Sequence, residues 1–260
     1  MATAVFRTAR YLQRWLSPIF DPRSVLRSLW ALARYPGFLH KYMGYRRISD
    51  ERVPFVEIYP CLDDQGSKSQ SGRGHYFYQD IWALERVLER KPIKHVDIGS
   101  RIDGFAGQLS AVCSVEYVDI RPVELGLERF TMREGSLLDL PYDDWTVDSL
   151  SCLHVIEHIG LGRYGDPVDP SGSIKAAGEL VRVLAQGGRL LLGVPIGQER
   201  VAFNAHRILS PLTILDWFSE LRLVEFSVVA DDGQFRRFAV PNDYLMSDYA
   251  CGLFLFERDR

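Results

Sequence analysis

The stretch KHVDIGSRIDGFAGQLSAVCSVEYVDIRP, residues 94–122, contains two short apolar runs that each carry an aspartate near their end. The first run, HVDIG, leads into a turn at Gly99 and a helical segment, and the second run, VEYVDI, follows about 20 residues later. A strand, a glycine turn, a helix and a second strand form a βαβ unit, which builds a parallel sheet. The stretch therefore predicts a Rossmann-like α/β fold.

Strands and helices continue to alternate along the rest of the chain. Three further apolar runs, VDSLSCL, GRLLLGVP and LRLVEFSVV, are separated by the helical segments SIKAAGELVRVLA and SPLTILDWFSEL, and ACGLFLFER closes the chain as a last strand. This alternation is typical of a doubly wound, mainly parallel sheet. We therefore expect one α/β domain over residues 93–260.

Residues 1–48 differ from the rest of the chain in charge. They hold nine Lys and Arg residues against one acid, Asp21, which gives a net charge of +8 and leaves −11 for the other residues of a chain that carries −3 overall. Basic and apolar side chains fall on different faces of two predicted helices, the second starting at Pro22 and stopping at Pro36 and Gly37. Such a basic amphipathic helical extension suits an anionic membrane surface, and the alternatives are packing on protein or a removable mitochondrial presequence.

Residues 49–92 are predicted to connect the two parts, with a strand at 53–60, a polar Gly/Ser-rich loop at 61–74 and a helix at 75–89. No run reaches about 18 apolar residues, so no membrane-spanning helix is expected. The four cysteines are scattered, which indicates reduced, mostly buried thiols. We therefore expect a cytoplasmic protein, with peripheral attachment to the inner face of the membrane as one alternative.

Gly99 and Asp119 stand where a nucleoside would bind in a doubly wound sheet. Ligands of such sheets lie beyond the carboxyl ends of the strands. The glycine lets a ligand approach the backbone, and a carboxylate after the next strand can accept hydrogen bonds from both ribose hydroxyls. The alternative is a strand-to-helix turn that binds no cofactor.

Block by block, residues 94–258 resemble class I S-adenosylmethionine-dependent methyltransferases. The blocks are HVDIGSRIDGF, YVDIRP, REGSLLDLPYDDWTVDSLSCLHVIEHI and ELVRVLAQGGRLLLGVP. The segments DIGSRIDGF, HVIEHIGLGRYGDPVDP and RVAFNAHRILSP also resemble an uncharacterised methyltransferase-like family found, among other places, in bacterial gene clusters for surface polysaccharides. The resemblance implies a seven-stranded sheet with an antiparallel last strand, and S-adenosylmethionine as the cofactor.

The same resemblance assigns cofactor contacts. It places Asp97, Gly99 and Ser100 at the methionine part with Arg101 beside them, Asp119 and Ile120 at the ribose, Ser136 and Leu137 beside adenine, and His154 at the end of the fourth strand. Two departures from the family pattern stand out. Arg101 and Asp103 replace glycines and would reshape the methionine end, and Ser136 replaces the acid that commonly meets the adenine amino group. Arg101 also suggests an anionic ligand such as a nucleotide sugar.

The segment SCLHVIEHIGLGRYGDP, residues 151–167, contains H-x-x-E-H, which also describes the zinc site of inverted-motif metallopeptidases. Such a site needs two histidines on one face of a regular helix. Here a buried strand runs into His154, and Gly160 and Gly162 soon end any helix. We therefore predict no metal at this motif and interpret it as the exit of the fourth strand.

The H-x-x-E-H segment supplies candidates for transfer chemistry instead. Methyl transfer to a hydroxyl needs alignment and a base for the hydroxyl proton, and an imidazole suits that role. Our candidate base is His158, with His154 behind it and Glu157 as the orienting partner; the alternative is a capping residue and a local polar pair. Glu157, His158 and Asp166 could also hold a divalent cation, but the sequence does not support their convergence.

Two polar loops are candidates for the acceptor site. Residues 160–172 are rich in Gly and Pro and stand in the position of a lid, and FNAHR, residues 203–207, follows the fifth strand. The predicted acceptor-binding residues are Arg163, Tyr164, Asp166, Asn204, His206 and Arg207. These side chains suit a sugar, nucleotide-sugar or glycan acceptor, and ordinary solvated loops are the alternative.

Together the patterns predict a methyltransferase that acts on an oxygen of a sugar-containing acceptor in surface polysaccharide or lipopolysaccharide biosynthesis. One alternative is a methyltransferase-like subunit that acts in binding or assembly without transfer chemistry, and another is a different reaction on a nucleotide sugar. We expect no nucleic-acid partner, because the domain that carries the candidate site is acidic. The sequence leaves the oligomeric state open, and an oligomer is one alternative.

Overall fold

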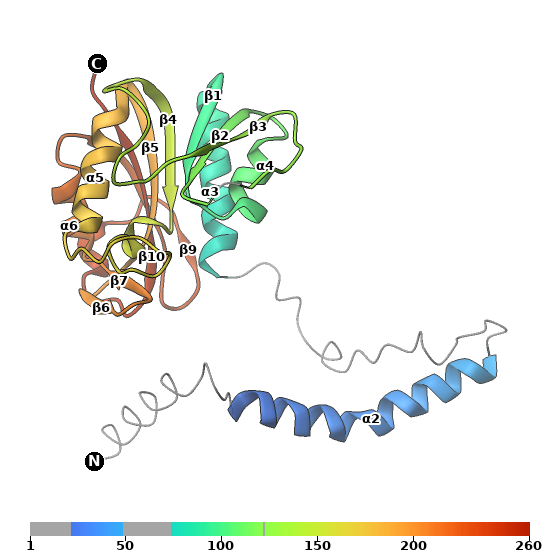
Figure 1. The fold of residues 1–260 in the computed structure, drawn as a ribbon. Helices are drawn as coiled ribbons and strands as arrows, with labels where there is room; N and C mark the ends of the chain where they lie inside the picture. The colour runs from blue at the N-terminus through green and yellow to red at the C-terminus, as the bar shows by residue number, and fades with distance from the viewer. Residues whose placement is uncertain (1–21, 49–73, 122) are drawn as a thin grey trace, which may run out of the picture. The chain divides into compact units, whose positions relative to one another are not determined.

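The computed structural model describes residues 22–48, 74–121 and 123–260 (Figure 1). The chain divides into two compact units, residues 1–70 and 71–260. The predicted strand at 53–60 and the predicted first helix lie outside the described residues.

Helix α2 (Pro22–Ile48) is the described part of the first unit. Its described part begins at Pro22, the predicted first helical position, where a proline fits because the first turn needs no N–H donor. The predicted stop at Pro36 and Gly37 is wrong, since the helix continues through Pro36. A proline removes a single backbone donor, and the hydrogen bonds on either side of it maintain the helix. No helix in the described ranges is long and apolar enough to cross a membrane.

The second unit is built on one sheet with the strand order β3-β2-β1-β4-β5-β10-β8-β9. Its strands are β1 (Lys94–Ile98), β2 (Ser114–Asp119), β3 (Phe130–Glu134), β4 (Val147–Leu153), β5 (Leu184–Ile196), β8 (Arg222–Val229), β9 (Phe235–Arg236) and β10 (Ala250–Glu257). Strands β1 to β5 pair in parallel, and β10 runs antiparallel between β5 and β8. The predicted doubly wound sheet with an antiparallel last strand is confirmed.

The predicted number of seven strands is wrong, because the sheet has eight. The additional strand is β9, which is two residues long and forms a hairpin with β8. Its turn is closed by hydrogen bonds from Gly233 N to Ala230 O (2.8 Å) and from Ala230 N to Gln234 O (3.0 Å). Two residues are too few to show the alternating pattern by which a strand is recognised.

Helices cover both faces of the sheet, with α5 and α6 on one side and α3 and α4 on the other (Figure 1). Helix α3 (His75–Arg90) precedes β1. The elements between the strands are the π-helical turn η2 (Ile102–Ala106), α4 (Gly107–Leu109), the 3-10 turn η3 (Ile156–His158), α5 (Gly172–Val183), α6 (Pro211–Trp217) and the 3-10 turn η4 (Pro241–Tyr244). The short strands β6 (Arg200–Ala202) and β7 (His206–Ile208) form a separate hairpin.

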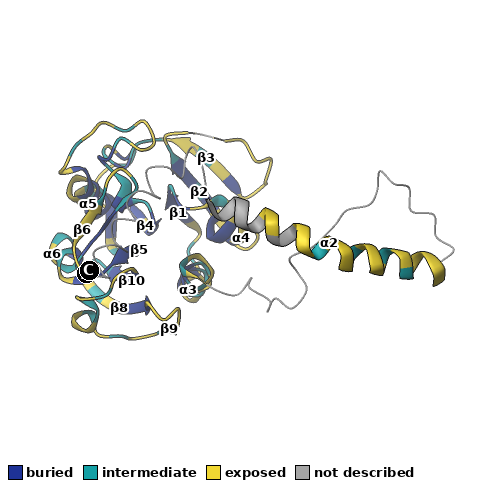
Figure 2. Cartoon of the chain, turned by 90° about the horizontal axis from the view of Figure 1, so that it is seen from below, coloured by how far each residue is buried: buried dark blue, intermediate teal, exposed yellow. Residues whose placement is uncertain are grey.

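Two apolar clusters fill the space between the sheet and these helices, and Figure 2 shows the central strands as mostly buried. Strand β5 contributes to both, because successive side chains of a strand point to opposite faces. Leu190 and Leu192 pack in the cluster that contains Leu180 of α5, whereas Leu191 packs in the cluster that contains Trp82 of α3. The helix predicted at 75–89 is therefore part of the same compact unit as the sheet.

The topology brings the ends of several strands to the same edge of the sheet. The parallel strands β1, β2, β4 and β5 all end there. Strand β10 begins at this edge because it is antiparallel, and Cys251 pairs with Pro195 near the end of β5. Residues after β1, β2 and β4 can therefore meet residues at the start of β10.

Candidate functional site

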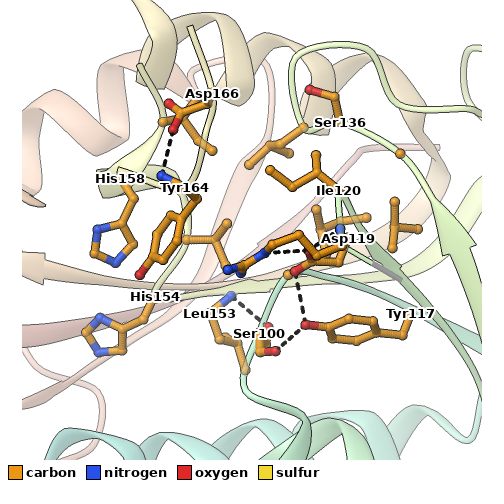
Figure 3. A pocket seen from close by; sticks show the side chains of 18 of the residues that line it. Ser100, Tyr117, Asp119, Ile120, Ser136, Leu153, His154, His158, Tyr164 and Asp166 are labelled. Carbon is orange, nitrogen blue, oxygen red and sulfur yellow. Dashed lines mark hydrogen bonds and ion pairs between the residues drawn. The ribbon is translucent and has the colours of Figure 1, made fainter. Parts of the chain in front are cut away.

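A cavity of about 840 Å³ opens at the carboxyl ends of β1, β2 and β4. Its walls include, among the predicted site residues, Gly99, Ser100, Arg101, Asp119, Ile120, Ser136, Leu137, His154, His158, Tyr164 and Asp166 (Figure 3). The volume lies within the range of small-molecule sites. Most of the predicted cofactor residues and part of the predicted acceptor residues therefore share one cavity.

Gly99 forms the turn that ends β1. Its φ is +64°, and a Cβ atom at this position would lie 3.2 Å from Cγ1 of Val155. The N–H of Gly99 donates to the carbonyl of Val118 at 2.9 Å, which ties the turn to β2. Glycine fits here because it adopts a positive φ without strain and leaves the cavity wall open.

Asp97 is buried and does not line the cavity. Its carboxylate accepts hydrogen bonds from the backbone N–H (3.2 Å) and hydroxyl (2.7 Å) of Ser100, and from the hydroxyl of Ser151. Burial raises the pKa of Asp97 to about 6, although these hydrogen bonds act in the opposite direction. Asp97 therefore fixes the Ser100 turn, and only the turn itself reaches a ligand.

Asp119 presents a carboxylate at the end of β2. Its Oδ1 accepts a hydrogen bond from the backbone N–H of Arg121 at 2.8 Å, and its Oδ2 lies 3.4 Å from the hydroxyl of Tyr117 (Figure 3). The Tyr117 hydroxyl donates at 2.7 Å to the carbonyl of Ser100. Because the Tyr117 contact to Asp119 is long, Oδ2 can accept further hydrogen bonds from a ligand.

The two unusual residues of the glycine turn pair with each other. Nη2 of Arg101 lies 2.7 Å from Oδ2 of Asp103, and the guanidinium of Arg101 lies 4.7 Å from the ring centre of Tyr76. The charge of Arg101 is thus balanced within the turn. Gly104, the residue after Asp103, packs so closely on Asp80 that a Cβ atom would lie 2.3 Å from its Oδ2.

Ser136 and Leu137 form the wall of the cavity next to β3. Leu137 is buried, and the hydroxyl of Ser136 accepts a hydrogen bond from the N–H of Leu138 at 3.1 Å. The hydroxyl thus closes its own turn. It retains a donor hydrogen for a ligand.

The H-x-x-E-H segment begins directly after β4, which ends at Leu153, as predicted. His154 has a φ of +57°, and η3 then turns the chain through Glu157 and His158. Nδ1 of His154 lies 2.9 Å from Oε1 of Glu157, and the same oxygen lies 3.7 Å from Nε2 of His158. Burial disfavours the protonated form of His154, but Cys251 and Glu157 outweigh it and raise the pKa of His154 above its usual value.

His158 is oriented by the backbone. Its Nδ1 lies 2.6 Å from the carbonyl oxygen of Ala205, which can only accept, so Nδ1 carries the proton. Nε2 therefore has a lone pair available for a proton. The ring of Tyr164 meets the ring of His158 edge to face at a centroid distance of 5.5 Å.

Polar side chains of the predicted lid hydrogen-bond to backbone groups of the protein. The carboxylate of Asp166 accepts hydrogen bonds from the N–H groups of Gly160 (2.6 Å) and Tyr164 (3.2 Å), which shapes the loop. Arg163 donates to the carbonyl of Ala205 at 2.8 Å and does not line the cavity. Tyr164 and Asp166 are thus the lid residues at the cavity.

The predicted acceptor residues of the loop at residues 203–207 lie outside the cavity wall. Arg207 is buried and donates to the carbonyl of Ile159 at 2.6 Å and to the hydroxyl of Ser173 at 2.9 Å. Asn204 is exposed and lies outside the cavity wall. The ring of His206 is half-buried and lies 5.2 Å, centre to centre, from Tyr249.

Within residues 22–48, 74–121 and 123–260, Glu157, His158 and Asp166 do not form a set of convergent ligand atoms for a divalent cation. The carboxylate of Asp166 is engaged by the lid backbone, and Nδ1 of His158 by Ala205. Convergent metal-ligating atoms in these ranges belong to another set, His75, His154 and Cys251.

Sequence reasoning missed residues that come to the site from distant elements. Tyr76 lines the cavity from the start of α3, and His75 beside it stacks on Tyr249. Cys251 reaches His154 from the start of β10. The predicted antiparallel direction of the last strand is a signal that could have located Cys251 at this edge of the sheet.

Comparisons with known proteins agree with this architecture. The profile of a family described as "Caenorhabditis protein of unknown function, DUF268" matches residues 141–228, and no curated protein matches the chain. The [4+2]-cyclase SpnF superposes with a TM-score of 0.51 at 14% identity, over 70% of this chain and 80% of that chain. A protein assigned as a sarcosine dimethylglycine methyltransferase, from Galdieria sulphuraria, superposes with a TM-score of 0.50 at 16% identity, over 70% and 86%. The second unit thus has the fold of class I methyltransferases, and identities this low show the fold alone.

Proposed function

We propose that the protein is an S-adenosylmethionine-dependent methyltransferase that acts on an oxygen of a sugar-containing acceptor. The observation that carries the proposal is the single cavity, in which the Gly99 turn and the Asp119 carboxylate share a space with His158. A nucleoside-type site and a basic imidazole are the two parts that such a transfer needs.

The residues present fit this cofactor at its nucleoside end. The backbone at Gly99 is open to the cavity, and Oδ2 of Asp119 can accept from a ribose hydroxyl. Leu137 gives the adenine side an apolar wall, and the hydroxyl of Ser136 can donate to a ring nitrogen. At the other end, the Arg101–Asp103 pair would frame the methionine part in place of two glycines.

The chain's own contribution to the reaction would be positioning and proton removal. S-adenosylmethionine, when bound, supplies a sulfonium methyl group that an acceptor oxygen can attack. Nε2 of His158 is available to take the proton from the acceptor hydroxyl, because Nδ1 is held by the Ala205 carbonyl. Tyr164 packs against the His158 ring and limits its rotation.

A sugar is the acceptor class that best suits the wall of the cavity beyond His158. Tyr164 offers an aromatic face and a hydroxyl, and Asp166 offers carboxylate oxygens that also organise the lid. We extend the proposal to a glycan or nucleotide-sugar acceptor in surface polysaccharide or lipopolysaccharide assembly, which rests on the sequence resemblance described above. We also propose that the protein works in the cytoplasm, at the inner face of the membrane.

Calorimetry with S-adenosylhomocysteine tests the cofactor part of the proposal. We expect the wild-type chain to bind it, and Asp119→Ala to weaken binding at least about 10-fold through the loss of a charge-assisted hydrogen bond to ribose. Asp148→Ala is the matched control, because Asp148 is an exposed acid on β4 outside the cavity. Absence of binding at millimolar ligand would overturn the proposal, and so would an equal effect of both variants.

Two other functions remain as alternatives with their own tests. The fold is shared with a cyclase, so the second candidate is a subunit or enzyme that does not transfer a methyl group. Transfer of a labelled methyl group to glycan acceptors would reject this candidate.

The third candidate is a reaction on a nucleotide sugar with Arg101 at the phosphates. Asp103 already neutralises Arg101, which counts against it, and an Arg101→Ala variant with unchanged sugar-nucleotide affinity would exclude it.

A further inference from the structure

Three side chains with metal-ligating atoms meet beside the cavity, each from a different element. His75 is the first residue of α3, His154 follows β4, and Cys251 is the second residue of β10. One ligand atom from each lies within 4.8 Å of the other two. Nε2 of His154 and Sγ of Cys251 are 3.5 Å apart.

We propose that His75, His154 and Cys251 bind one divalent transition-metal ion, and that zinc is the ion that suits them best. Thiolate and imidazole together are the ligands that zinc prefers. Zinc bond lengths of about 2.3 Å to sulfur and about 2.0 Å to nitrogen in a tetrahedral site place the two ligand atoms about 3.5 Å apart. The observed distance between His154 and Cys251 matches this separation, so this edge of the site is already formed.

Glu157 holds His154 in the orientation that a metal ligand requires. Its Oε1 lies 2.9 Å from Nδ1 of His154, which places the proton on Nδ1 and directs Nε2 toward Cys251. A carboxylate behind a ligating histidine is the usual second partner in zinc sites. The side chain of Glu157 is 1% exposed, and its other oxygen makes no hydrogen bond with the residues that the structure describes. Burying a carboxylate costs less free energy when a cation lies beside it than when it has no partner for its charge.

Three protein ligands leave one position of a tetrahedral ion open. This count is characteristic of zinc sites that bind water or a substrate, whereas purely structural sites usually have four protein ligands. His154 lines the cavity but His75 and Cys251 do not, so the ion would lie behind the cavity wall, next to His154. The site is therefore separate from the H-x-x-E-H pattern of metallopeptidases, since His158 is not one of its ligands.

The same geometry does not suit a cysteine nucleophile. The order Cys251, His154, Glu157 is that of a thiol, a base and an orienting acid. However, Cys251 is fully buried and does not line the cavity, so a substrate cannot reach its sulfur. A small ion needs only the space between the three ligand atoms.

Titration of the metal-free full-length chain with Co(II) and with Zn(II) tests the site directly. We expect one ion per chain, with the ligand-field bands of four-coordinate Co(II), a thiolate-to-cobalt charge-transfer band, and displacement of Co(II) by Zn(II). Cys251→Ser should abolish the charge-transfer band, and His75→Asn should weaken binding at least about 100-fold. Glu157→Gln should retain the band and weaken binding about 10-fold to 100-fold, as expected for a residue that acts through His154.

Cys113→Ser is the matched control, because Cys113 is also a buried free thiol but its thiol hydrogen-bonds to the backbone carbonyls of Pro92 and Ser114 and is not part of the metal-ligating cluster. It should bind Co(II) like the wild type. Circular dichroism of each metal-free variant separates loss of a ligand from loss of the fold. A wild-type chain that binds no Co(II), or a Cys251→Ser chain that is folded and keeps the charge-transfer band, would overturn the proposal. The readout is metal binding, so it is independent of methyl transfer.

Discussion

Nδ1 of His154 lies 2.9 Å from Oε1 of Glu157, and the two side chains are 5% and 1% exposed. A buried polar pair of this kind stabilises a fold only while both partners are present, because either partner left alone in an apolar environment loses its hydrogen bonds to water. The pair joins the end of β4 to η3. It therefore fixes the backbone that also carries His158.

Glu157→Ala should lower the free energy of unfolding more than Glu157→Gln does. The alanine variant leaves the buried N–H of His154 without an acceptor, at a cost of about 1–3 kcal/mol, whereas a glutamine oxygen can still accept that hydrogen bond. Urea unfolding of the metal-free proteins at pH 7 measures the difference. Equal losses in the two variants would show that the hydrogen bond contributes nothing.

Two glycines should respond to alanine with opposite signs. Gly160, at the start of the lid, has a φ of +80°, and a Cβ atom there would lie 2.0 Å from the carbonyl oxygen of Asp169. We expect Gly160→Ala to destabilise the protein by about 2 kcal/mol or more. Gly178 lies inside α5, and a Cβ atom there would meet no atom within 4 Å, so Gly178→Ala should stabilise the protein by about 0.5–1 kcal/mol. Denaturant midpoints of the two variants provide the comparison, and a shift in the same direction would contradict this reasoning.

The fold and the position of Gly99 and Asp119 at one cavity could be predicted because their signals are local. Alternating apolar runs indicate the strands, and the Gly99 turn with Asp119 lies within one βαβ unit. The histidine and cysteine cluster could not be predicted in this way, since His75 and Cys251 meet only because α3 packs against the sheet that contains β10. The burial of Arg207 could not be predicted, because residue type and loop position do not show where a long side chain points. Its guanidinium satisfies the carbonyl of Ile159 inside the fold.

Helix α2 should bind anionic membranes through its apolar stripe. Leu29, Leu32, Leu39 and Met43 are exposed at helical spacing, and basic residues Arg46 and Arg47 lie in the last turn. Figure 2 shows most of the described residues of α2 as exposed. Apolar residues that enter the interface combined with basic residues are typical of peripheral membrane helices. Leu32→Asp with Leu39→Asp should remove most binding of the full-length chain to vesicles of anionic lipid in a sedimentation assay. Val168→Asp, at an exposed apolar residue of the second unit, is the control and should bind normally.

His95 should make stability fall steeply in mild acid. The residue is fully buried in β1, and its ring nitrogens lie 2.7 Å from the hydroxyl of Ser149 and 2.8 Å from that of Ser151. Burial lowers the pKa of His95 to about 3, against 6.5 in the unfolded chain. Below pH 6.5 the unfolded chain therefore binds a proton that the folded chain does not, so the contribution of His95 to stability is complete above pH 6.5 and is lost progressively down to about pH 3.

The loss approaches about 1.4 kcal/mol for each pH unit below 6.5, which amounts to about 2 kcal/mol at pH 5. His95→Gln cannot take up this proton. Its stability at pH 7 should be lower than that of the wild type, because glutamine does not reproduce the packing of the ring against Phe105, but its pH dependence should be shallower. The raised pKa of Asp97 has the opposite effect on the pH dependence of stability. Because Asp97 is present in both proteins, its contribution cancels in the difference between them. Urea unfolding at pH 7, 6 and 5 should show the gap between the two proteins closing by about 2 kcal/mol, and a gap that stays constant would mean that His95 is not held neutral by burial.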